Sequence, residues 1–429
     1  MNTVPLPADA DVVVIGAGAF GLSTAYHLTA LGAGRVVVLD QFAPASQTSP
    51  RAAGLFKLVQ ADVTLTALAR LSAEIVTGFE RATGVPLPHV QSGSLLLART
   101  AAHAAMIRAE AAQSRHWGVE ADEIAPAALH DYAPYLEQTG ILAAIDVPGD
   151  IYFEEPSTLL AAYQTAGERL GMTVIGETAV TAIRMERGRV AGVATPRGEV
   201  RTPVVVDAAG AWSPIVGALA GVTIPVAPVR HQLRITAPLG GIEAGQRIAR
   251  FVDASVYLRP ARGGLMVGGM ERDPLPLDPR DTDPSFTMAD VPLDGRVLDR
   301  MTTTVRDQVP SLVDAPIAET RGGLFTMTVD AHFLAGPVPG ATGFWAATGC
   351  NGSGFSLSSG IGRVLAEWIT GGSPSIDCST IAPDRFTGLS ADRSTLVAAG
   401  IEQYANYYTP RPVSYHAADT GASAISARH

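Results

Sequence analysis

Glycines near the start of the chain have the spacing of a phosphate-binding turn. Residues 11–20 read DVVVIGAGAF, so Gly16, Gly18 and Gly21 form a G-x-G-x-x-G pattern directly after an apolar run. The first glycine of such a pattern permits a tight turn, the second lets the backbone approach a pyrophosphate, and the third lets a helix pack closely on the strand. The pattern predicts a dinucleotide at a helix N-terminus, where free N–H groups and the helix dipole favour phosphate.

A carboxylate follows at the position that a ribose hydroxyl requires. A second apolar run, residues 35–39, ends on Asp40, and dinucleotide-binding units carry an acid about 20 residues beyond the glycines for this purpose. Ala19 and Phe20 in the turn and Gln41 after the acid complete the predicted contacts of the unit. The motif by itself leaves NAD, NADP and FAD open.

These side chains need a strand, a helix and a second strand to position them. The helix is predicted over residues 22–31, between the two apolar runs. Further along, VVVDAAGAW (residues 204–212) again joins an apolar run to small residues, and ligands of open α/β sheets collect at that end of a strand. Ala209, Gly210 and Trp212 are therefore predicted at the cofactor. Ala52, Ala53 and Gly54 follow one another in a predicted loop, and such small residues allow the backbone to lie against a flat ligand.

The remaining pattern alternates helices with short strands. A hairpin around ERGRV is predicted to join strands 173–180 and 190–194, and residues 225–270 read as an antiparallel sheet. Residues from about 388 onward are weakly patterned, and the end of the chain reads as disordered. Helices are predicted over residues 61–81, 101–114, 156–171, 297–309 and 361–369, and strands over 93–98 and 344–347.

Composition restricts the class of protein. The 429 residues carry a net charge of -10 without a basic cluster, which disfavours binding to nucleic acid or anionic lipid. No secretory leader or membrane span is evident, so a soluble cytoplasmic protein is expected. The cysteines, Cys350 and Cys378, lack metal-type spacing, and no metal site is predicted.

The combination of VVVIGAGAFG, VVDAAGAWS, YLRP with GGLMVGG, and TGCNGSGFSLSSGIG resembles the D-amino acid oxidase type of FAD-dependent oxidoreductases. The similarity is nearest to sarcosine oxidase, dimethylglycine dehydrogenase and glycine oxidase and covers about residues 11–386. It implies an α/β fold in which a Rossmann-like FAD-binding domain is interleaved with an α+β substrate domain on a mixed, largely antiparallel sheet. The expected FAD-binding segments are 1–85, 150–225 and 320–388, the substrate segments are 86–149 and 226–319, and residues 389–429 form a partly disordered C-terminal extension.

The resemblance also implies where FAD lies. Val180 would contact adenine, and the loop Ser49 to Gly54, including Arg51, would lie along the isoalloxazine. Arg321 could approach the flavin or form a helix or domain salt bridge. The turn after residue 348 would bring backbone N–H groups to the flavin pyrimidine edge through Gly349, Asn351, Gly352, Ser353, Gly354, Phe355 and Ser356. Arg51 stands where dimethylglycine dehydrogenases carry a flavin-linking histidine, and the segment after Arg321 lacks the linking cysteine of sarcosine oxidases. Noncovalent FAD is therefore expected.

Oxidation of an amine at its C–N bond, by hydride transfer to flavin N5, is the leading functional hypothesis. Lys57, the only lysine, is a candidate anchor for a substrate carboxylate or a flavin contact, with a solvated lysine as the alternative. Tyr257 and Arg259 alternate on one strand and share a face, so both are candidates for substrate contact or for packing. His231 is a weaker candidate, and Asn351 could face substrate or serve turn geometry.

Two alternatives stay open. Oxidation of a 2-hydroxy acid would demand a base, with His231 or His332 as the first suspects. An FAD-binding subunit of a multi-subunit dehydrogenase would need no substrate site. The electron acceptor, O2 or another, and the oligomeric state are undetermined, and the substrate is expected to be a small amine or amino acid.

Overall fold

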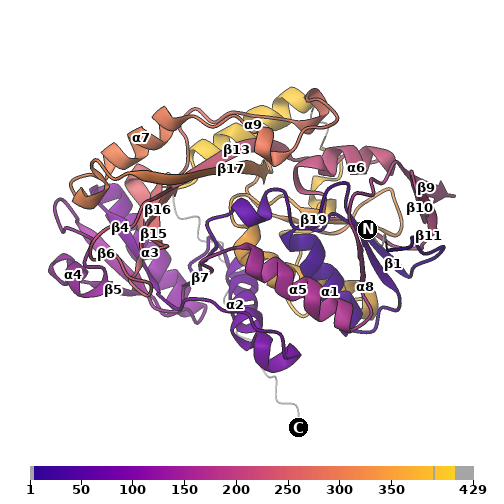
Figure 1. Cartoon of the computed structure of the whole chain (residues 1–429), viewed down its shortest axis with the longest axis horizontal. Helices are drawn as coiled ribbons and strands as arrows, with labels where there is room; N and C mark the ends of the chain where they lie inside the picture. The colour runs from indigo at the N-terminus through magenta and orange to yellow at the C-terminus, as the bar shows by residue number, and fades with distance from the viewer. Residues whose placement is uncertain (1–3, 390–391, 411–429) are drawn as a thin grey trace, which may run out of the picture.

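The computed structural model describes residues 4–389 and 392–410 of the chain. One of its two large sheets, which contains the strands β1 and β19 labelled in Figure 1, has the order β18-β19-β12-β1-β2-β8 and is parallel except for β18, which runs antiparallel to β19. The chain enters β1 at the centre, moves to β2 on one side and returns to β12 on the other. Such a reversal of strand order creates a crevice at the carboxyl ends of the strands. The strands are β1 (Val12–Ile15), β2 (Val36–Leu39), β8 (Thr173–Ile175), β12 (Val205–Asp207), β18 (Leu334–Pro337) and β19 (Phe344–Thr348).

Both faces of this sheet are covered, which explains why its strands are apolar throughout. Successive side chains of a strand point to opposite faces. Val12 and Val14 pack with the helices, whereas Val13 and Ile15 join the core shared with the small β9–β11 sheet and α6. The helices on the first face are α1 (Ala19–Ala30), α2 (Val63–Thr83), α5 (Ser157–Arg169) and α8 (Gly354–Gly371), and α6 spans Ser213–Leu219.

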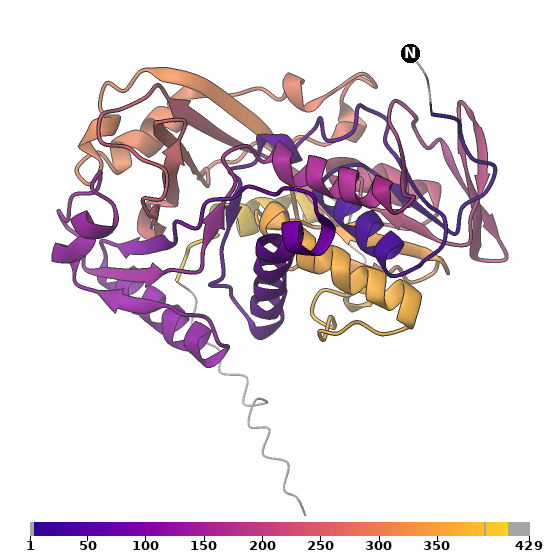
Figure 2. The same ribbon diagram turned by 60° about the horizontal axis from the view of Figure 1, so that its bottom comes forward.

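The second large sheet has the order β17-β13-β16-β15-β14-β4-β6-β5, in which only the β14–β4 pair is parallel. Leu96 and Ile145 pack beneath α3 (Ala101–His116), while Leu95 and Leu97 face the core that includes α7 (Gly295–Thr304). Figure 2 shows α3 (violet) and α8 (yellow-orange) in the separate lobes built on the two sheets. The strands are β4 (Ser94–Ala98), β5 (Asp122–Ile124), β6 (Ala143–Val147), β13 (Ala227–Thr236), β14 (Ile248–Phe251), β15 (Val256–Ala261), β16 (Gly264–Gly269) and β17 (Ile317–Met327).

The two sheets draw on alternating stretches of the chain. The six-stranded sheet uses residues from 12–39, 173–207 and 334–348, and the eight-stranded sheet uses residues from 94–147 and 227–327. A short antiparallel pair, β3 (Leu55–Phe56) with β7 (Ile151–Tyr152), lies between them in the sequence, and the short helix α4 covers Leu129–Tyr132. This is the α/β fold with a mixed, largely antiparallel second sheet that the sequence predicts. The exact domain boundaries stay a prediction.

Three local predictions were wrong. The hairpin joins β9 (Ala182–Glu186) to β10 (Arg189–Thr195), with β11 (Gly198–Arg201) beside it, whereas β8 already ends at Ile175. α8 begins at Gly354, well before the predicted start at residue 361. Its glycines let it approach α1: a Cβ on Gly362 would lie 2.3 Å from Ser23 Oγ.

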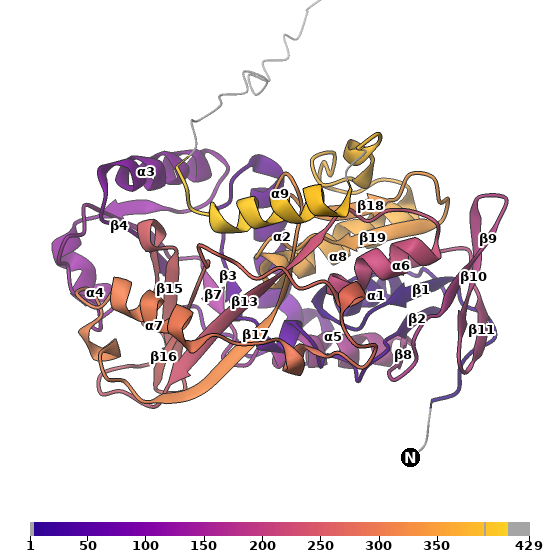
Figure 3. The same cartoon turned by 90° about the horizontal axis from the view of Figure 1, so that it is seen from above.

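The third difference is at the C-terminus. Instead of weakly patterned chain, residues Arg393–Ala405 form helix α9, which lies across β13 and β17 (Figure 3). The predicted disordered end, residues 411–429, lies outside the described residues. No helix within the described residues is long and apolar enough to cross a membrane.

Candidate functional site

A long pocket begins at the carboxyl end of β1 and reaches the inner strands of the second sheet. It brings together most of the residues that the sequence singles out, over a chain separation of several hundred positions. The predicted residues that line it are Gly16, Gly18, Ala19, Phe20, Asp40, Gln41, Ser49, Arg51, Ala52, Ala53, Gly54, Lys57, Val180, Ala209, Gly210, Trp212, His231, Tyr257, Arg321, Gly352, Ser353, Gly354, Phe355 and Ser356. Gly21, Arg259, Gly349 and Asn351 are not among the lining residues.

The glycine turn has the geometry that its spacing predicts. Gly16 has φ +106°, and a Cβ there would lie 2.5 Å from the Ala208 carbonyl oxygen. A Cβ on Gly21 would lie 1.8 Å from the Gly16 carbonyl oxygen, so Gly21 permits close packing of α1 and has no place in the pocket wall. Gly18 precedes α1 without a side-chain cap, and Ser49 Oγ accepts a hydrogen bond from Ala19 N at 3.1 Å.

Asp40 ties the end of β2 to this turn. Its Oδ2 accepts a hydrogen bond from Ala17 N at 2.7 Å, and its Oδ1 accepts one from Phe42 N at 2.8 Å. Burial raises the pKa of Asp40, and the two N–H donors act against that rise. Each carboxylate oxygen retains a lone pair, so the side chain can still accept from a ribose hydroxyl in the pocket. Val180 and Leu219 supply apolar wall in the same pocket.

Arg259 supports the pocket from behind instead of facing it. It is fully buried, its Nε donates to Ala53 O at 2.8 Å, and its guanidinium lies 4.6 Å from the centroid of the Tyr152 ring. It also donates to Pro260 O at 2.7 Å and Phe153 O at 3.2 Å. These contacts use the guanidinium to hold the loop that ends at Gly54, so the predicted substrate contact of Arg259 is replaced by a supporting one.

The C-terminal turn meets the pocket at the start of α8. Ser353 precedes α8 without a side-chain cap, so the first backbone N–H groups of the helix remain available to a ligand. Asn351 lies outside the pocket wall because its side chain completes the turn: Oδ1 accepts from Thr328 N at 2.9 Å, and Nδ2 donates to Gly349 O at 2.8 Å. Its φ of +43° also fits the turn role and not substrate contact.

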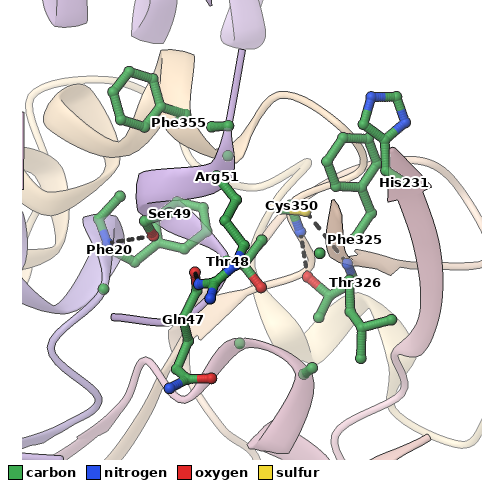
Figure 4. A pocket seen from close by; sticks show the side chains of 18 of the residues that line it. Phe20, Gln47, Thr48, Ser49, Arg51, His231, Phe325, Thr326, Cys350 and Phe355 are labelled. Carbon is green, nitrogen blue, oxygen red and sulfur yellow. Dashed lines mark hydrogen bonds between the residues drawn. The ribbon is translucent and has the colours of Figure 1, made fainter. Parts of the chain in front are cut away.

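Aromatic and neutral groups form the wall next to this turn. His231 stacks on Phe325 with ring centroids 4.2 Å apart, and Cys350 lies next to Thr326 in the same wall (Figure 4). His231 Nε2 is 2.9 Å from Tyr257 Oη and its Nδ1 is 2.8 Å from Tyr404 Oη. Burial lowers the pKa of His231 to about 3, so the ring is neutral at ordinary pH.

Two cations lie at the far end of the pocket. Lys57 Nζ donates to Tyr407 Oη and lies 4.8 Å from the centroid of that ring. Burial raises the pKa of Glu110, and the charges of Lys57 and Arg250 act against that rise. Burial opposes ionisation of the Tyr407 phenol, but the charges of Lys57 and Arg250 and the hydrogen bonds of Lys57 and Ser353 together lower the pKa of Tyr407. Arg250 also lines the pocket and pairs with the buried Asp150.

Arg51 and Arg321 line the middle of the pocket. Arg51 Nη1 donates to the carbonyl oxygens of Ser46 and Gln47, and burial together with the charge of Arg321 lowers its pKa. Arg321 pairs with Glu155 at 3.3 Å and with Glu319, while its buried Nη1 has no partner within the described residues. Arg321 therefore combines the predicted pocket position with the salt bridges of the alternative interpretation.

Sequence reasoning missed Arg250 and the C-terminal tyrosines. Tyr404, Tyr407 and Tyr408 have the i, i+3, i+4 spacing that places side chains on one face of a helix, and this signal was available in the sequence. Arg250 sits in the short strand IARF, where nothing in the sequence distinguishes it from a structural arginine.

His332 lies away from the pocket wall. Its Nε2 is 2.9 Å from Asp62 Oδ2, and this hydrogen bond raises the pKa of His332. It is thus not placed to act as a base on a bound substrate. No cluster of three or more histidine, cysteine or acidic side chains able to hold a metal occurs among residues 4–389 and 392–410.

These features fit FAD. The helices α1 and α8 begin without a side-chain cap, and the first turn of each helix lines the pocket. Helix N-termini stabilise anions. A turn that only glycine can form and a carboxylate beyond it complete a dinucleotide site.

Comparison with known proteins agrees with this geometry. The chain is 32% identical to mitochondrial sarcosine dehydrogenase of Mus musculus over 94% of this chain and 44% of that protein. It is 29% identical to the formaldehyde-forming 4-methylaminobutanoate oxidase of Paenarthrobacter nicotinovorans over 94% of this chain and 49% of that protein. The chain thus spans about half the length of these curated relatives.

Solved structures share the fold. The crystal structure of L-proline dehydrogenase from P. horikoshii superposes with a TM-score of 0.81 at 23% identity, covering 90% of this chain and 100% of that one. The sequence model of the DAO family, described as FAD dependent oxidoreductase, matches residues 11–368. Because this match covers most of the chain and agrees with the fold and the dinucleotide site, the chain belongs to the DAO family of FAD-dependent oxidoreductases.

Proposed function

We propose that this protein oxidises a small amine or N-alkyl amino acid at its C–N bond and yields an imine. Bound FAD would supply the acceptor for the hydride. The observation that carries the proposal is the pairing of two cations, Lys57 and Arg250, with a neutral aromatic wall at one end of a dinucleotide pocket. The similarity to sarcosine dehydrogenase and to 4-methylaminobutanoate oxidase supports the same class of donor.

The cofactor would lie along the pocket with its adenosine end at β2 and Val180 and its flavin end at the start of α8. We place the pyrophosphate at Gly16 and Gly18, the adenosine ribose at Asp40 and the adenine beside Val180. The isoalloxazine would lie along residues 49–54 and at the N-terminus of α8. The unpartnered Nη1 of Arg321 is available to an acceptor on the cofactor.

Lys57 and Arg250 are suited to hold the carboxylate of the substrate. Arg250 donates to Asp150 and Ser94 through one nitrogen, Nη2, so the other nitrogens of its guanidinium are left for the pocket. In the described part of the chain Lys57 Nζ donates to the Tyr407 phenol, and burial favours the neutral form of Glu110, the carboxyl group on which its charge acts, so the charge of Lys57 remains available to an anion. Half-buried cations attract a carboxylate more strongly than surface cations do, because water screens them less.

The same charges help to prepare the amine. Oxidation by hydride transfer needs a neutral nitrogen whose lone pair can assist departure of the hydride. A nearby positive charge disfavours an ammonium ion and lowers its pKa. The aromatic wall, with neutral His231 and Tyr257, provides no carboxylate to stabilise that ammonium. The chain therefore needs no separate base if the substrate binds as the free amine.

An anaerobic panel tests the proposal. Purified protein would be mixed with N-methyl amino acids, amines of the same length without a carboxylate, and 2-hydroxy acids, and flavin absorbance would be followed. Reduction by carboxylated amines is expected. Reduction by hydroxy acids alone would refute the proposal in favour of alcohol oxidation, and reduction by none of them would favour the FAD-binding subunit.

The structure gives little support to alcohol oxidation. That reaction needs a base at the substrate, yet His231 has both ring nitrogens bound to tyrosine hydroxyls and His332 is turned to Asp62. The electron acceptor, cytoplasmic localisation and noncovalent attachment of FAD remain predictions from the sequence.

A further inference from the structure

Three side chains from distant parts of the chain form a hydrogen-bonded row that ends in the pocket. Tyr404 on α9 contacts His231 on β13 at 2.8 Å, and His231 contacts Tyr257 on β15 at 2.9 Å. Tyr404 is fully buried, and His231 and Tyr257 are each 7% exposed. The positions of the hydrogens in this row decide what Tyr257 can offer a substrate.

His231 carries a single ring proton. Its burial lowers its pKa to about 3, and a neutral imidazole has one donor nitrogen and one acceptor nitrogen. Its two partners are both hydroxyls, each of which can donate or accept. The direction in which these hydrogen bonds are donated is therefore set by the tyrosine whose hydroxyl proton has no acceptor other than His231.

Tyr404 is that tyrosine. It is fully buried, and burial raises the pKa of its phenol well above the usual range, so the hydroxyl keeps its proton. That proton needs an acceptor, since buried hydroxyls seldom go without one, whereas Tyr257 lines the pocket and can turn its proton there. Within the described residues His231 Nδ1 is the acceptor in reach.

The remaining hydrogens follow. With Nδ1 accepting, the ring proton lies on Nε2, which donates to Tyr257 Oη. The proton of Tyr257 then has no acceptor in the row and is free to point into the pocket, which Tyr257 lines. A Tyr257 proton pointing at the amine lone pair would oppose hydride departure. The acceptor that suits it is a carboxylate oxygen.

We propose that Tyr404 is a positioning residue that fixes the tautomer of His231 and thereby makes Tyr257 a permanent hydrogen-bond donor to the substrate carboxylate. The identity of the ligand as a carboxylate rests on the proposed function. The direction of the hydrogen bonds among Tyr404, His231 and Tyr257 does not depend on it. It also excludes His231 as a base, because Nε2 already carries the proton. Tyr257 would act with Lys57 and Arg250 on the same anion.

α9 is built to hold Tyr404 in place, although it lies beyond residue 368, where the family match ends. Gly400 lets the helix approach β13, since a Cβ there would lie 2.7 Å from the Ala227 Cβ. Arg393 at the start of α9 pairs with Asp278 at 3.3 Å and with Asp281. The helix is therefore fixed both at its N-terminus and at its centre.

The tautomer can be measured directly. The full-length, FAD-bound protein would be labelled with 15N-histidine, and the His231 ring signals would be assigned by their loss in His231→Gln. Nuclear magnetic resonance distinguishes a protonated from an unprotonated ring nitrogen. We expect a protonated Nε2 and an unprotonated Nδ1 at pH 7. A proton on Nδ1, or on both nitrogens, would overturn the inference whether or not any amine is a substrate.

The effect on ligands is tested with Tyr→Phe variants. Tyr257→Phe is expected to weaken binding of a carboxylate that lacks the amine, followed by its perturbation of flavin absorbance, by about ten- to a hundredfold, as for loss of a hydrogen bond to a charged group. Tyr404→Phe should weaken it about threefold or more and shift the His231 nitrogen signals. Tyr135→Phe is the control, because it loses a 2.6 Å hydrogen bond to Arg247 O outside the pocket wall.

The outcomes separate the two proposals. If Tyr257→Phe weakens carboxylate binding and Tyr404→Phe does not differ from Tyr135→Phe, the role of Tyr404 is refuted. If neither variant affects carboxylate binding, the carboxylate ligand of Tyr257 is refuted. Bound FAD in each variant, read from its visible spectrum, shows that the protein has folded.

Discussion

Replacing Lys57 with methionine tests how the substrate is anchored. The side chain keeps its length and loses its charge, while Ser49, Asp40 and the glycine turn are untouched, so FAD should stay bound. A hydrogen bond to a charged group contributes about 1.5–3 kcal/mol. In the free protein Lys57 Nζ already donates to Tyr407 Oη, and displacing that neutral partner costs about 1 kcal/mol. The net loss is about 0.5–2 kcal/mol.

This difference corresponds to a roughly two- to thirtyfold weaker affinity for a carboxylated amine. The assay is anaerobic titration, with flavin absorbance reporting both binding and reduction. An amine of the same length without the carboxylate should be unaffected. Arg108→Met is the matched control, since it removes an exposed cation that pairs with Glu123 away from the pocket. Equal affinity of wild type and Lys57→Met for the carboxylated amine would refute the anchoring argument.

Three other predictions concern FAD and stability. Gly16→Ala should weaken FAD binding at least tenfold in a fluorescence titration, because its Cβ would lie 2.5 Å from Ala208 O. Gly32→Ala is the control for the effect of a positive φ alone, since Gly32 has φ +79° and nothing within 4 Å of its Cβ position. Equal losses of FAD affinity in the two variants would contradict the clash. Burial raises the pKa of Asp207 to about 7, so the folded state holds a proton that the unfolded state releases, and stability should fall as pH rises from about 4 through 7. Asp207→Asn should flatten this dependence, by up to about 3 kcal/mol between pH 5 and pH 8 in thermal unfolding; an unchanged difference between the two pH values would contradict it. Acid precipitation should release all FAD and leave a colourless protein pellet. A yellow pellet from the wild type together with a colourless pellet from Cys350→Ala would instead show a covalent link to this pocket cysteine.

The dinucleotide site could be predicted from local sequence because its chemistry is local. A strand, a glycine turn and a helix N-terminus are consecutive in the chain, and Gly16 and Gly21 have contacts that exclude any side chain. Asp40 follows at the end of the next strand, where parallel pairing with β1 brings it to the turn. The resemblance to a family then selected FAD among the dinucleotides.

For Arg259 and Asn351 the sequence left open a ligand contact and a structural role, and the contacts of both residues are those of the structural role. Both are polar residues next to ligand-lining segments, and polar side chains at such places either face the ligand or satisfy the backbone that does. Arg259 donates to Ala53 O, and Asn351 closes its own turn through Gly349 O. Periodicity and motif spacing do not distinguish these two roles, because the difference depends on hydrogen-bond partners from other segments.

The sequence by itself determined the kind of cofactor site, the alternation of its elements and the presence of a lone lysine near the flavin loop. Only the tertiary structure decided what surrounds that lysine and what His231 can do. Tyr404 meets His231 across 173 positions of the chain, and Lys57 meets Tyr407 across 350. Local patterns do not encode such pairings, which arise when α9 packs on β13 and the residues that follow α9 bring Tyr407 to the pocket.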